Sequence, residues 1–517
     1  MSRFDRFSLL AVTAVAALLR LPGIDARGRF DADQGHDMLT LMAFTRNGVW
    51  PLLGPKTSVG DFHHGAFYYY LLAPAAALSN DNPVVVTAWI ALLGIGAVVL
   101  TWWLARSIGG PLAGALAGML LAISPAAIDE STFIWNPNPI AFFAVLALGA
   151  AWHAHRNAAV LPRGRVAAWW SLAIGAAGAV MELHILGIVF LAAIGVLALI
   201  EVRRTRAALL GVAGGAGLVL LLLLPLLVHE LQNDWLETRL MVAYLFGGAG
   251  SPNGGPALAL AFTLFRIVGW PLVGLVTDVP AATGVLVAIV IGLIGIWDLR
   301  ARGDERTAMW WLVGILAWST VALAFAAPSL QTVVAGLPND HYHAFVDPIV
   351  VILIAVPTAS LFQSALAAWR ARRTTPRAAA PALIGIAVVV LAVGMLSRKP
   401  PAVDPDGGWP ALQAAGQRVA SQVGTAVVVV EGVPTFKLPA ALEFPVAYAG
   451  GHTRGFFMQA IGYFAVACDR LFEDAIHQQC GGQAEDALLQ SQDLAADLID
   501  RFDASPRTVV SLYRPRS

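Results

Sequence analysis

Charged residues are scarce in this sequence. They make up 13% of the chain, whereas 58% of its residues are hydrophobic. Soluble domains contain about a quarter charged residues. Many of the apolar runs reach the roughly 20 residues that a helix needs to cross a bilayer. This composition excludes an ordinary soluble domain and predicts a polytopic membrane protein.

Other classes of protein find no support either. The formal net charge is zero, so no excess of positive charge favours nucleic acid as a partner. The histidines and cysteines show no zinc-site spacing. Neither a solenoid-type repeat nor the inverted repeat typical of secondary transporters is found. No small-x-small cleavage site follows the first apolar segment, so we expect a retained span and not a signal peptide.

About eleven apolar segments have the length and composition of membrane spans. They lie at 8–21, 84–105, 111–124, 139–153, 166–181, 183–200, 207–228, 281–297, 308–327, 345–368 and 380–397. Most arginines of the connecting segments, 372–377 included, fall on the side of the N-terminus, which the positive-inside rule makes cytoplasmic. The first loop, about 22–83, and the C-terminal residues are then extracytoplasmic. A single membrane crossing by 256–278 would place all later loops on the opposite side. We therefore expect an interfacial or re-entrant segment there.

After Leu396 the composition changes to that of a soluble domain. Strands are predicted at 425–430, 464–467 and 508–512, and an amphipathic helix at 484–502. We therefore divide the chain into a membrane module, 1–399, and a small extracytoplasmic α/β domain, 400–517. The only two cysteines, Cys468 and Cys480, lie in this domain. Outside the cytoplasm such a pair favours a disulfide, and two reduced buried thiols are the alternative.

The first external loop gathers acids and bases beside the bilayer. They are Asp31, Asp33, Asp37, His36, Lys56, His63 and His64. An enzyme that joins a sugar to a hydroxyl needs one ionised carboxylate to take the hydroxyl proton, and Asp33 is the candidate. A lipid phosphate leaves readily, but donors or positive charge must stabilise it as negative charge develops. We expect His36, Lys56, His63 and His64 to do so, with pH sensitivity near neutrality. The alternative is a solvated acidic turn that caps a helix.

Several motifs of the first two external loops occur in a particular order. They are Asp33-Gln34-x-x-Asp37, Gly48-Val49-Trp50-Pro51, Phe62-His63-His64-Gly65 leading into Tyr68-Tyr69-Tyr70-Leu71, and Trp135-Asn136-Pro137-Asn138-Pro139. Together they resemble GT-C glycosyltransferases, which include protein O-mannosyltransferases, the lipid A aminoarabinose transferase and Rgt-type lipopolysaccharide-core transferases. The resemblance covers residues 1–200 well. The later spans are similar only in their arrangement along the chain, and the C-terminal domain lies outside the resemblance.

The resemblance implies a GT-C type all-α membrane fold and a polyprenyl-phosphate-linked sugar as donor. Asp33 falls on the family's catalytic aspartate. Gln34 replaces the usual glutamate, and His64-Gly65 replaces a Lys-Pro pair. Asn136 and Asn138 fall in an element of the Rgt-type branch, and we expect them to help position the acceptor or the sugar.

Two further pairs carry expectations of their own. His341 and Tyr342, in the last external loop, lie where the family brings a basic or tyrosine side chain to the donor phosphate, and an ordinary polar loop is the alternative. Glu182 and His184 lie at a tight outer turn, where they line a cavity or form a hairpin tip in water. The aromatic segment 65–78 is expected to be an interfacial helix with a tyrosine belt.

The second external loop holds an acidic pair, Asp129 and Glu130. Three roles fit this pair. It positions the acceptor or sugar, it caps a helix, or Asp129 binds a divalent cation together with Asp33. No cofactor is certain from the sequence, and a divalent cation is the one that this interpretation leaves open.

These features predict an inverting glycosyltransferase that moves a sugar from a polyprenyl-phosphate donor to an envelope glycan such as lipopolysaccharide, a lipid or a protein. Abundant Ala, Gly and Arg with few lysines indicate a high-GC bacterium, and so its plasma membrane. The rival function is a transporter or flippase of a lipid-linked envelope precursor. Transporters place polar residues at mid-membrane in broken helices, whereas here they gather at the outer ends.

Overall fold

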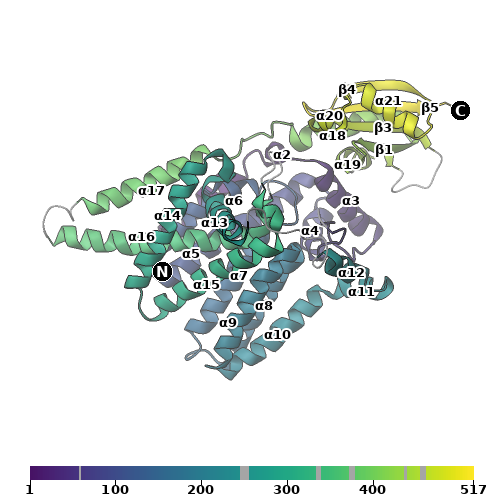
Figure 1. Cartoon of the computed structure of the whole chain (residues 1–517). Coiled ribbons are helices and arrows are strands. Elements are labelled where there is room, and N and C mark those ends of the chain that lie inside the picture. Colours follow the sequence, from purple (N-terminus) through teal and green to yellow (C-terminus); the bar gives the residue numbers. More distant parts are fainter. Residues whose placement is uncertain are drawn as a thin grey trace.

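The protein folds as a helical membrane module with a small sheet at its C-terminal end (Figure 1). The structure is a computed structural model and describes residues 1–57, 60–244, 255–332, 339–371, 379–435, 439–453 and 461–516. The arginines predicted at 372–377 lie outside these residues. The predicted fold class, an all-α polytopic membrane protein with a small C-terminal α/β part, is confirmed.

The membrane module consists of helices joined by short turns. Its elements are α1 (Arg3–Arg20), α2 (Ile24–Arg27), α3 (Ala32–Asn47), α4 (Phe67–Leu78), α5 (Pro83–Ala122), α6 (Pro125–Asp129), α7 (Ile140–Arg156), α8 (Arg163–Leu183), η1 (Ile185–Gly187), α9 (Ile188–Val202), α10 (Arg206–Leu222), α11 (Leu224–Gln232), α12 (Leu236–Ala243), α13 (Pro256–Val273), η3 (Val276–Asp278), α14 (Pro280–Arg300), α15 (Gly303–Ala326), η4 (Pro328–Gln331), η5 (Asp340–Val346), α16 (Asp347–Arg370) and α17 (Ala380–Ser397).

Within the described residues, 8 helices are long and apolar enough to cross a membrane, and α10 with α11 forms a ninth candidate bent by 53°. The long helix α5 holds two of the predicted spans, which meet at a kink. Gly110 adopts φ 85°, and Pro111 follows it. Proline lacks the N–H that would continue the helix, so the chain turns back here. The protein is therefore a multi-pass membrane protein.

Helix α13 is one of the eight candidate spans, and two of its side chains contact the predicted external loops. Arg266, in the middle of α13, binds Asp340 at the start of η5. Trp270, one turn later, donates to Glu130 of the second external loop at 3.1 Å. Because α13 has the length and composition of a membrane span, the expected interfacial or re-entrant segment stays a prediction.

Helix α4 differs from the predicted interfacial helix. Tyr68 and Tyr69 are 0% and 1% exposed, and both hydroxyls donate to Asp37 of α3. The predicted tyrosine belt is therefore wrong for these two residues. The physical reason is Asp37, since a buried carboxylate needs donors and two adjacent tyrosines supply them.

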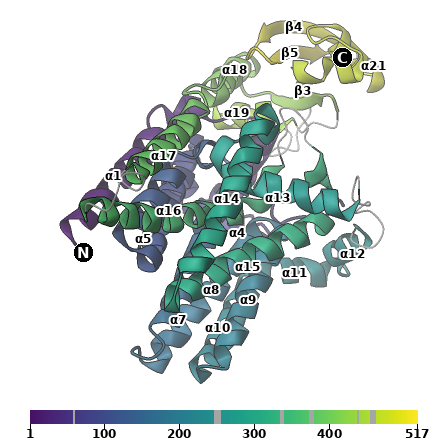
Figure 2. The same cartoon turned by 60° about the vertical axis from the view of Figure 1, so that its left-hand side comes forward.

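The C-terminal residues form a five-stranded sheet with helices packed against it. The elements are α18 (Gly408–Val423), β1 (Val427–Val433), α19 (Ala440–Tyr448), β2 (His452–Thr453), β3 (Ile461–Asp469), η6 (Arg470–Phe472), α20 (Glu473–Ile476), α21 (Gln483–Ser491), β4 (Ala496–Asp503) and β5 (Thr508–Pro515). The strand order is β2-β1-β3-β5-β4, with β1 parallel to β2 and β3, and with β5 antiparallel to β3 and β4. Cys468, in β3, forms a disulfide with Cys480. In both views α19 lies between the sheet and the helical module (Figure 1, Figure 2).

The predicted helix over 484–502 is wrong in its second half. Helix α21 ends at Ser491, and Asp493 adopts a left-handed φ of 52°. Residues from Ala496 onward form β4, which pairs with β5. As an edge strand with Leu498 and Ile499 exposed, β4 lacks the alternating burial from which a strand is recognised in sequence.

Candidate active site

The N-terminus of α3 is held by its own side chains. Asp31 is the N-cap: its carboxylate accepts the Ala32 N–H at 2.8 Å, and its N–H donates to Gln34 Oε1 at 2.9 Å. This reciprocal pattern is a capping box. Gln34 also donates to the Ile134 carbonyl at 2.9 Å, which joins the first external loop to the second. Gln34, where the resembled family has a glutamate, is therefore an anchor of both loops.

Asp33 lies in the first turn of α3 with its side chain exposed. Asp31 is the residue that caps the helix, and Asp33 is exposed beside it, so the alternative of a solvated acidic turn with a helix cap describes this turn as well. Asp37, one turn further on, is buried and accepts from Tyr68 at 3.0 Å and Tyr69 at 2.9 Å. The turn that bears Asp33 is thus fixed to α4, and a carboxylate at a helix N-terminus is stabilised by the helix dipole.

His36 lies on the same helix, 47% exposed, with Nδ1 3.9 Å from Asp37 Oδ1. The Asp37 carboxylate raises the pKa of His36 above its ordinary value, with smaller contributions from Asp33 and Glu443. Partial burial opposes this effect. The imidazole therefore keeps its proton to a higher pH than a free histidine does.

The second half of the loop is a small hairpin, in which Lys56 and His63 are paired as an isolated antiparallel bridge. Lys56 points into water and binds Asp61 at 2.9 Å. His63 binds Glu237 of α12 through both its backbone N–H, at 2.7 Å, and Nδ1, at 3.1 Å. The structure thus does not bring Lys56 and His63 to the same place as His64.

His64 instead joins a buried cluster from three parts of the chain, the histidine cluster, made of His64, His184, His341 and Tyr342. Ring centroids of His64 and His184 are 4.6 Å apart, and His184 is 5.3 Å from His341 and 4.9 Å from Tyr342. Trp135 of the second loop closes one side, 4.3 Å from His341. The fold therefore collects three predicted donor-phosphate residues around His184.

The hydrogen bonds of the histidine cluster indicate its protonation. His64 Nδ1 accepts the Ile185 N–H at 3.3 Å, and His184 Nδ1 accepts the Leu186 N–H at 3.3 Å. A ring nitrogen that accepts carries no proton, so each imidazole is neutral and presents Nε2–H. Burial lowers the pKa of His64 to about 3. The predicted pH sensitivity near neutrality is therefore wrong for His64, because desolvation keeps this ring uncharged.

Glu182 lies beside this cluster at the end of α8. It is 2% exposed, so the hairpin tip in water is wrong. The Gly65 N–H donates to the Glu182 carbonyl at 3.1 Å, and a Cβ on Gly65 would lie 2.0 Å from Glu182 Oε2. A side chain at position 65 would therefore require the buried Glu182 carboxylate to move. Within the described residues Glu182 Oε2 has no hydrogen-bond partner.

The two asparagines of the second loop hold backbone. Asn136 donates to the Leu183 carbonyl at 2.6 Å and Asn138 to the Phe133 carbonyl at 2.7 Å. Both side chains are buried. Their amides therefore fix the loop that carries Trp135 against the outer end of α8.

The two acids of the second external loop, Asp129 and Glu130, have different partners. Asp129 pairs with Arg29 at 3.0 Å, and Arg29 also covers the Phe133 ring at 4.4 Å. Glu130 points inward and accepts from Trp270, and burial raises its pKa above the ordinary value. Within the part of the chain that the structure describes, no group of three or more His, Cys, Asp or Glu could hold a metal ion. The alternative of a cation between Asp33 and Asp129 gains no support from these residues.

Arg266 was not among the predicted site residues, although it organises the last external loop. It is 0% exposed and pairs with Asp340 at 2.5 Å. Its other N–H groups donate to the carbonyls of Leu330 and Thr332 and to Asn339 Oδ1. All its donors are thus used by the loop that presents His341 and Tyr342. A lone arginine inside an apolar segment is the sequence signal that marks it.

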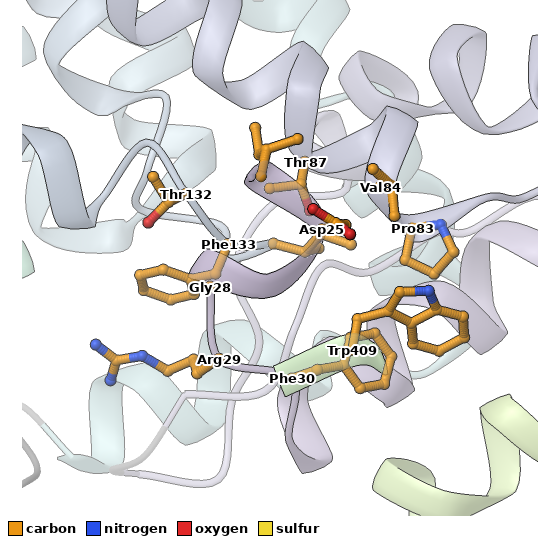
Figure 3. Close-up of a pocket in the computed structure, with 12 residues that line it drawn as sticks. Asp25, Gly28, Arg29, Phe30, Pro83, Val84, Thr87, Thr132, Phe133 and Trp409 are labelled. Carbon is orange, nitrogen blue, oxygen red and sulfur yellow. The ribbon is translucent and has the colours of Figure 1, made fainter. Parts of the chain in front are cut away.

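A pocket lies at the junction of the loops with the C-terminal residues (Figure 3). It lies among α2, the start of α5, the second external loop and Trp409, with Phe30 4.8 Å from the Trp409 ring. Arg29 and Asp25 are among its lining residues. It contains none of the predicted site residues.

Comparison with known proteins places this geometry in context. A sequence model of the dolichyl-phosphate-mannose-protein mannosyltransferase family matches residues 51–236. The crystal structure of ArnT from Cupriavidus metallidurans bound to undecaprenyl phosphate is similar, with a TM-score of 0.60 at 14% identity over 97% of both chains. This chain has the GT-C glycosyltransferase fold. The predicted resemblance is confirmed at the level of the fold.

Two further solved structures are similar. The same ArnT in the apo state gives a TM-score of 0.58 with the same coverage. The oligosaccharyltransferase of Archaeoglobus fulgidus in the apo form gives 0.49 over 96% of this chain and 73% of its own, at 14% identity. Curated protein sequences give no match. The ArnT match includes the C-terminal residues, whereas the family match begins at Pro51, after Asp33.

Proposed function

We propose that the protein is an inverting glycosyltransferase that uses a polyprenyl-phosphate-linked sugar, with Asp33 as general base. In this reaction the acceptor oxygen forms a bond to the anomeric carbon as the bond from that carbon to the phosphate oxygen breaks. The hydroxyl proton goes to Asp33, and the lipid phosphate leaves with the bonding electrons. The observation that carries the proposal is an exposed carboxylate on a helix turn that is fixed from beneath by Asp37, Tyr68 and Tyr69.

The donor phosphate is assigned to the histidine cluster. His64 and His184 present Nε2–H groups, and His341 and Tyr342 lie against them. Oriented neutral donors in a buried site stabilise developing charge more than they would in water. The undecaprenyl phosphate in the similar ArnT structure supports a lipid phosphate as this ligand. His36, Lys56 and His63 then have no direct contact with the phosphate and act at the rim.

Acceptor or sugar positioning is assigned to the second loop and the end of α8. Asp129 remains partly exposed while it pairs with Arg29. Glu182 has an oxygen available within a buried site. Asn136 and Asn138 support these two through the carbonyls that they bind, and Glu130 does so through its contact with Trp270. The acceptor is an envelope glycan, a lipid or a protein hydroxyl at the extracytoplasmic face of a bacterial plasma membrane, as the distribution of arginines predicts.

The test is sugar transfer in vitro from a panel of polyprenyl-phosphate sugars. We expect Asp33→Asn to lower turnover at least about a hundredfold, because the proton acceptor is lost while the shape is kept. Asp61→Asn is the matched control, since it changes an exposed acid of the same loop, 80% accessible and paired with Lys56. Treatment with a chelator in the same assay tests a divalent cation. Full turnover of the Asp33 variant would refute the mechanism.

A further inference from the structure

One ion pair joins the N-cap of α3 to the C-terminal domain. Arg507, in the turn between β4 and β5, donates to Asp469 through Nε and Nη2, both at 2.7 Å. The same Nη2 lies 3.2 Å from Asp31 Oδ2. Asp31 is the residue whose other carboxylate oxygen caps α3. A side chain close to the end of the chain therefore contacts the helix turn that carries Asp33.

The position of Arg507 is itself fixed within the domain. Its backbone N–H donates to Asp406 at 2.9 Å, and Ser505 donates to the same carboxylate oxygen at 2.6 Å. Asp469, at the end of β3, is 3% exposed. A bidentate pair with a buried carboxylate orients a guanidinium far better than a surface pair does. Arg507 is thus a rigid contact from the sheet to α3.

A second contact packs the same face of α3 against the C-terminal domain. Gly35, in the second turn of α3, lies so close to α19 that a Cβ would be 2.0 Å from the Ala440 carbonyl oxygen. Phe30, just before α3, packs on Trp409 at 4.8 Å and on Phe444 at 6.0 Å. These contacts leave Asp33 in a turn bounded on one side by the membrane module and on the other by the C-terminal domain.

We propose that the C-terminal domain completes the active site, with Arg507 as a positioning residue that acts through Asp31 to orient the Asp33 turn. This inference rests on the proposed function of Asp33. A base must meet the acceptor hydroxyl within hydrogen-bond reach, and small displacements of such a group lower turnover strongly. Arg507 touches neither sugar nor phosphate in this proposal, so it sets kcat and leaves donor binding unchanged.

The decisive variant is Asp31→Asn. Asparagine retains an oxygen to cap α3, and the Arg507–Asp469 pair inside the domain stays intact. We expect kcat to fall about tenfold with the donor KM unchanged within about twofold, because orientation is lost and binding is not. Amide hydrogen exchange of residues 33–38 should be about fivefold faster, since the first turn of α3 opens more often. Arg418→Ala is the matched control: it breaks a bidentate pair with Asp500, both bonds 2.8 Å, in the same domain.

Variants of Arg507 give a second line of evidence. Arg507→Ala should match Asp31→Asn in exchange and kcat, and the double variant should be no worse than Arg507→Ala alone, because both changes remove one contact. Arg507→Lys should recover part of kcat. Should Arg507→Ala fail to fold because the buried Asp469 loses its bidentate pair, Asp31→Asn still decides the question.

The outcomes separate the two proposals. If the wild-type protein transfers no sugar, the proposed function fails, and faster exchange in Asp31→Asn alone then supports the contact. If transfer occurs and Asp31→Asn changes neither exchange nor kcat beyond the Arg418→Ala control, the positioning role is refuted. A rise in donor KM at constant kcat would refute the positioning role as well, because that result would assign the Arg507–Asp31 contact to donor binding.

Discussion

The two ends of the first external loop hold their polar side chains in opposite environments. On α3, Asp33 and His36 are at the surface and charged groups surround them. At the other end, His64 is 6% exposed and its ring is kept neutral by burial. The loop is continuous in sequence, yet one end can accept a proton and the other offers only neutral N–H donors.

In the proposed function, this difference lets one loop serve both partners of the transfer reaction. A general base must lie where the acceptor hydroxyl can reach it, and Asp33 is exposed at the surface. A phosphate-binding group works best when water is excluded, because hydrogen bonds to the developing charge are then stronger. Gly65 makes the second environment by letting the loop approach Glu182 and the end of α8.

The largest effect is expected at Asp37, the buried carboxylate of α3. The double variant Tyr68→Phe, Tyr69→Phe removes both phenolic donors from Asp37, which is 2% exposed. A buried carboxylate that loses two of its donors costs about 3 kcal/mol of stability. We expect a clear fall in the thermal unfolding temperature in detergent, and slower transfer because α3 is no longer fixed to α4.

The matched control for this variant is Tyr70→Phe, the next residue along. Tyr70 donates to the Pro51 carbonyl at 2.8 Å and is partly exposed. Its loss should cost about 1 kcal/mol or less. Equal unfolding temperatures for the two variants would show that the Asp37 contact does not fix α3.

A smaller effect is expected at the neutral end. His64→Asn places an oxygen near the position of Nδ1, so the Ile185 N–H keeps a partner, while the Nε2–H is lost. We expect turnover to fall at least about tenfold with little change in stability. His64→Gln places its amide near Nε2 and should keep more activity. Equal turnover of wild type and His64→Asn would remove His64 from the phosphate site.

The smallest effect concerns pH. The pKa of His36 is raised in the folded protein, so the protonated ring stabilises the fold. This contribution is complete below the ordinary value of 6.5 and is lost as pH rises through the higher folded value. The effect is small because the side chain is half exposed. The unfolding temperature should be lower above this pH window than below it in the wild type and in His64→Gln. The difference should be smaller in His36→Gln. The same loss of dependence in His64→Gln would assign the titration to His64 instead.

Much of the fold follows from local sequence. Apolar runs such as 281–297 and 380–397 match α14 and α17, because a span must satisfy its backbone within one segment. The valine run at 427–430 matches β1. The segment 484–502 was predicted wrongly, since its second half becomes a strand only by pairing with β5. Strand pairing is a contact between distant residues, so local periodicity does not report it.

The sequence by itself determined the class of the protein, the number of spans to within a few, and the loops that hold the acids and histidines. Hydropathy and charge are properties of each residue, and whether a segment spans the bilayer depends mainly on the hydropathy and flanking charges of that segment. Only the tertiary structure decided that His64 is neutral, that Asp31 and not Asp33 caps α3, and that Arg507 reaches Asp31. Ionisation and hydrogen bonding depend on neighbours brought together from far along the chain, and no local pattern records those neighbours.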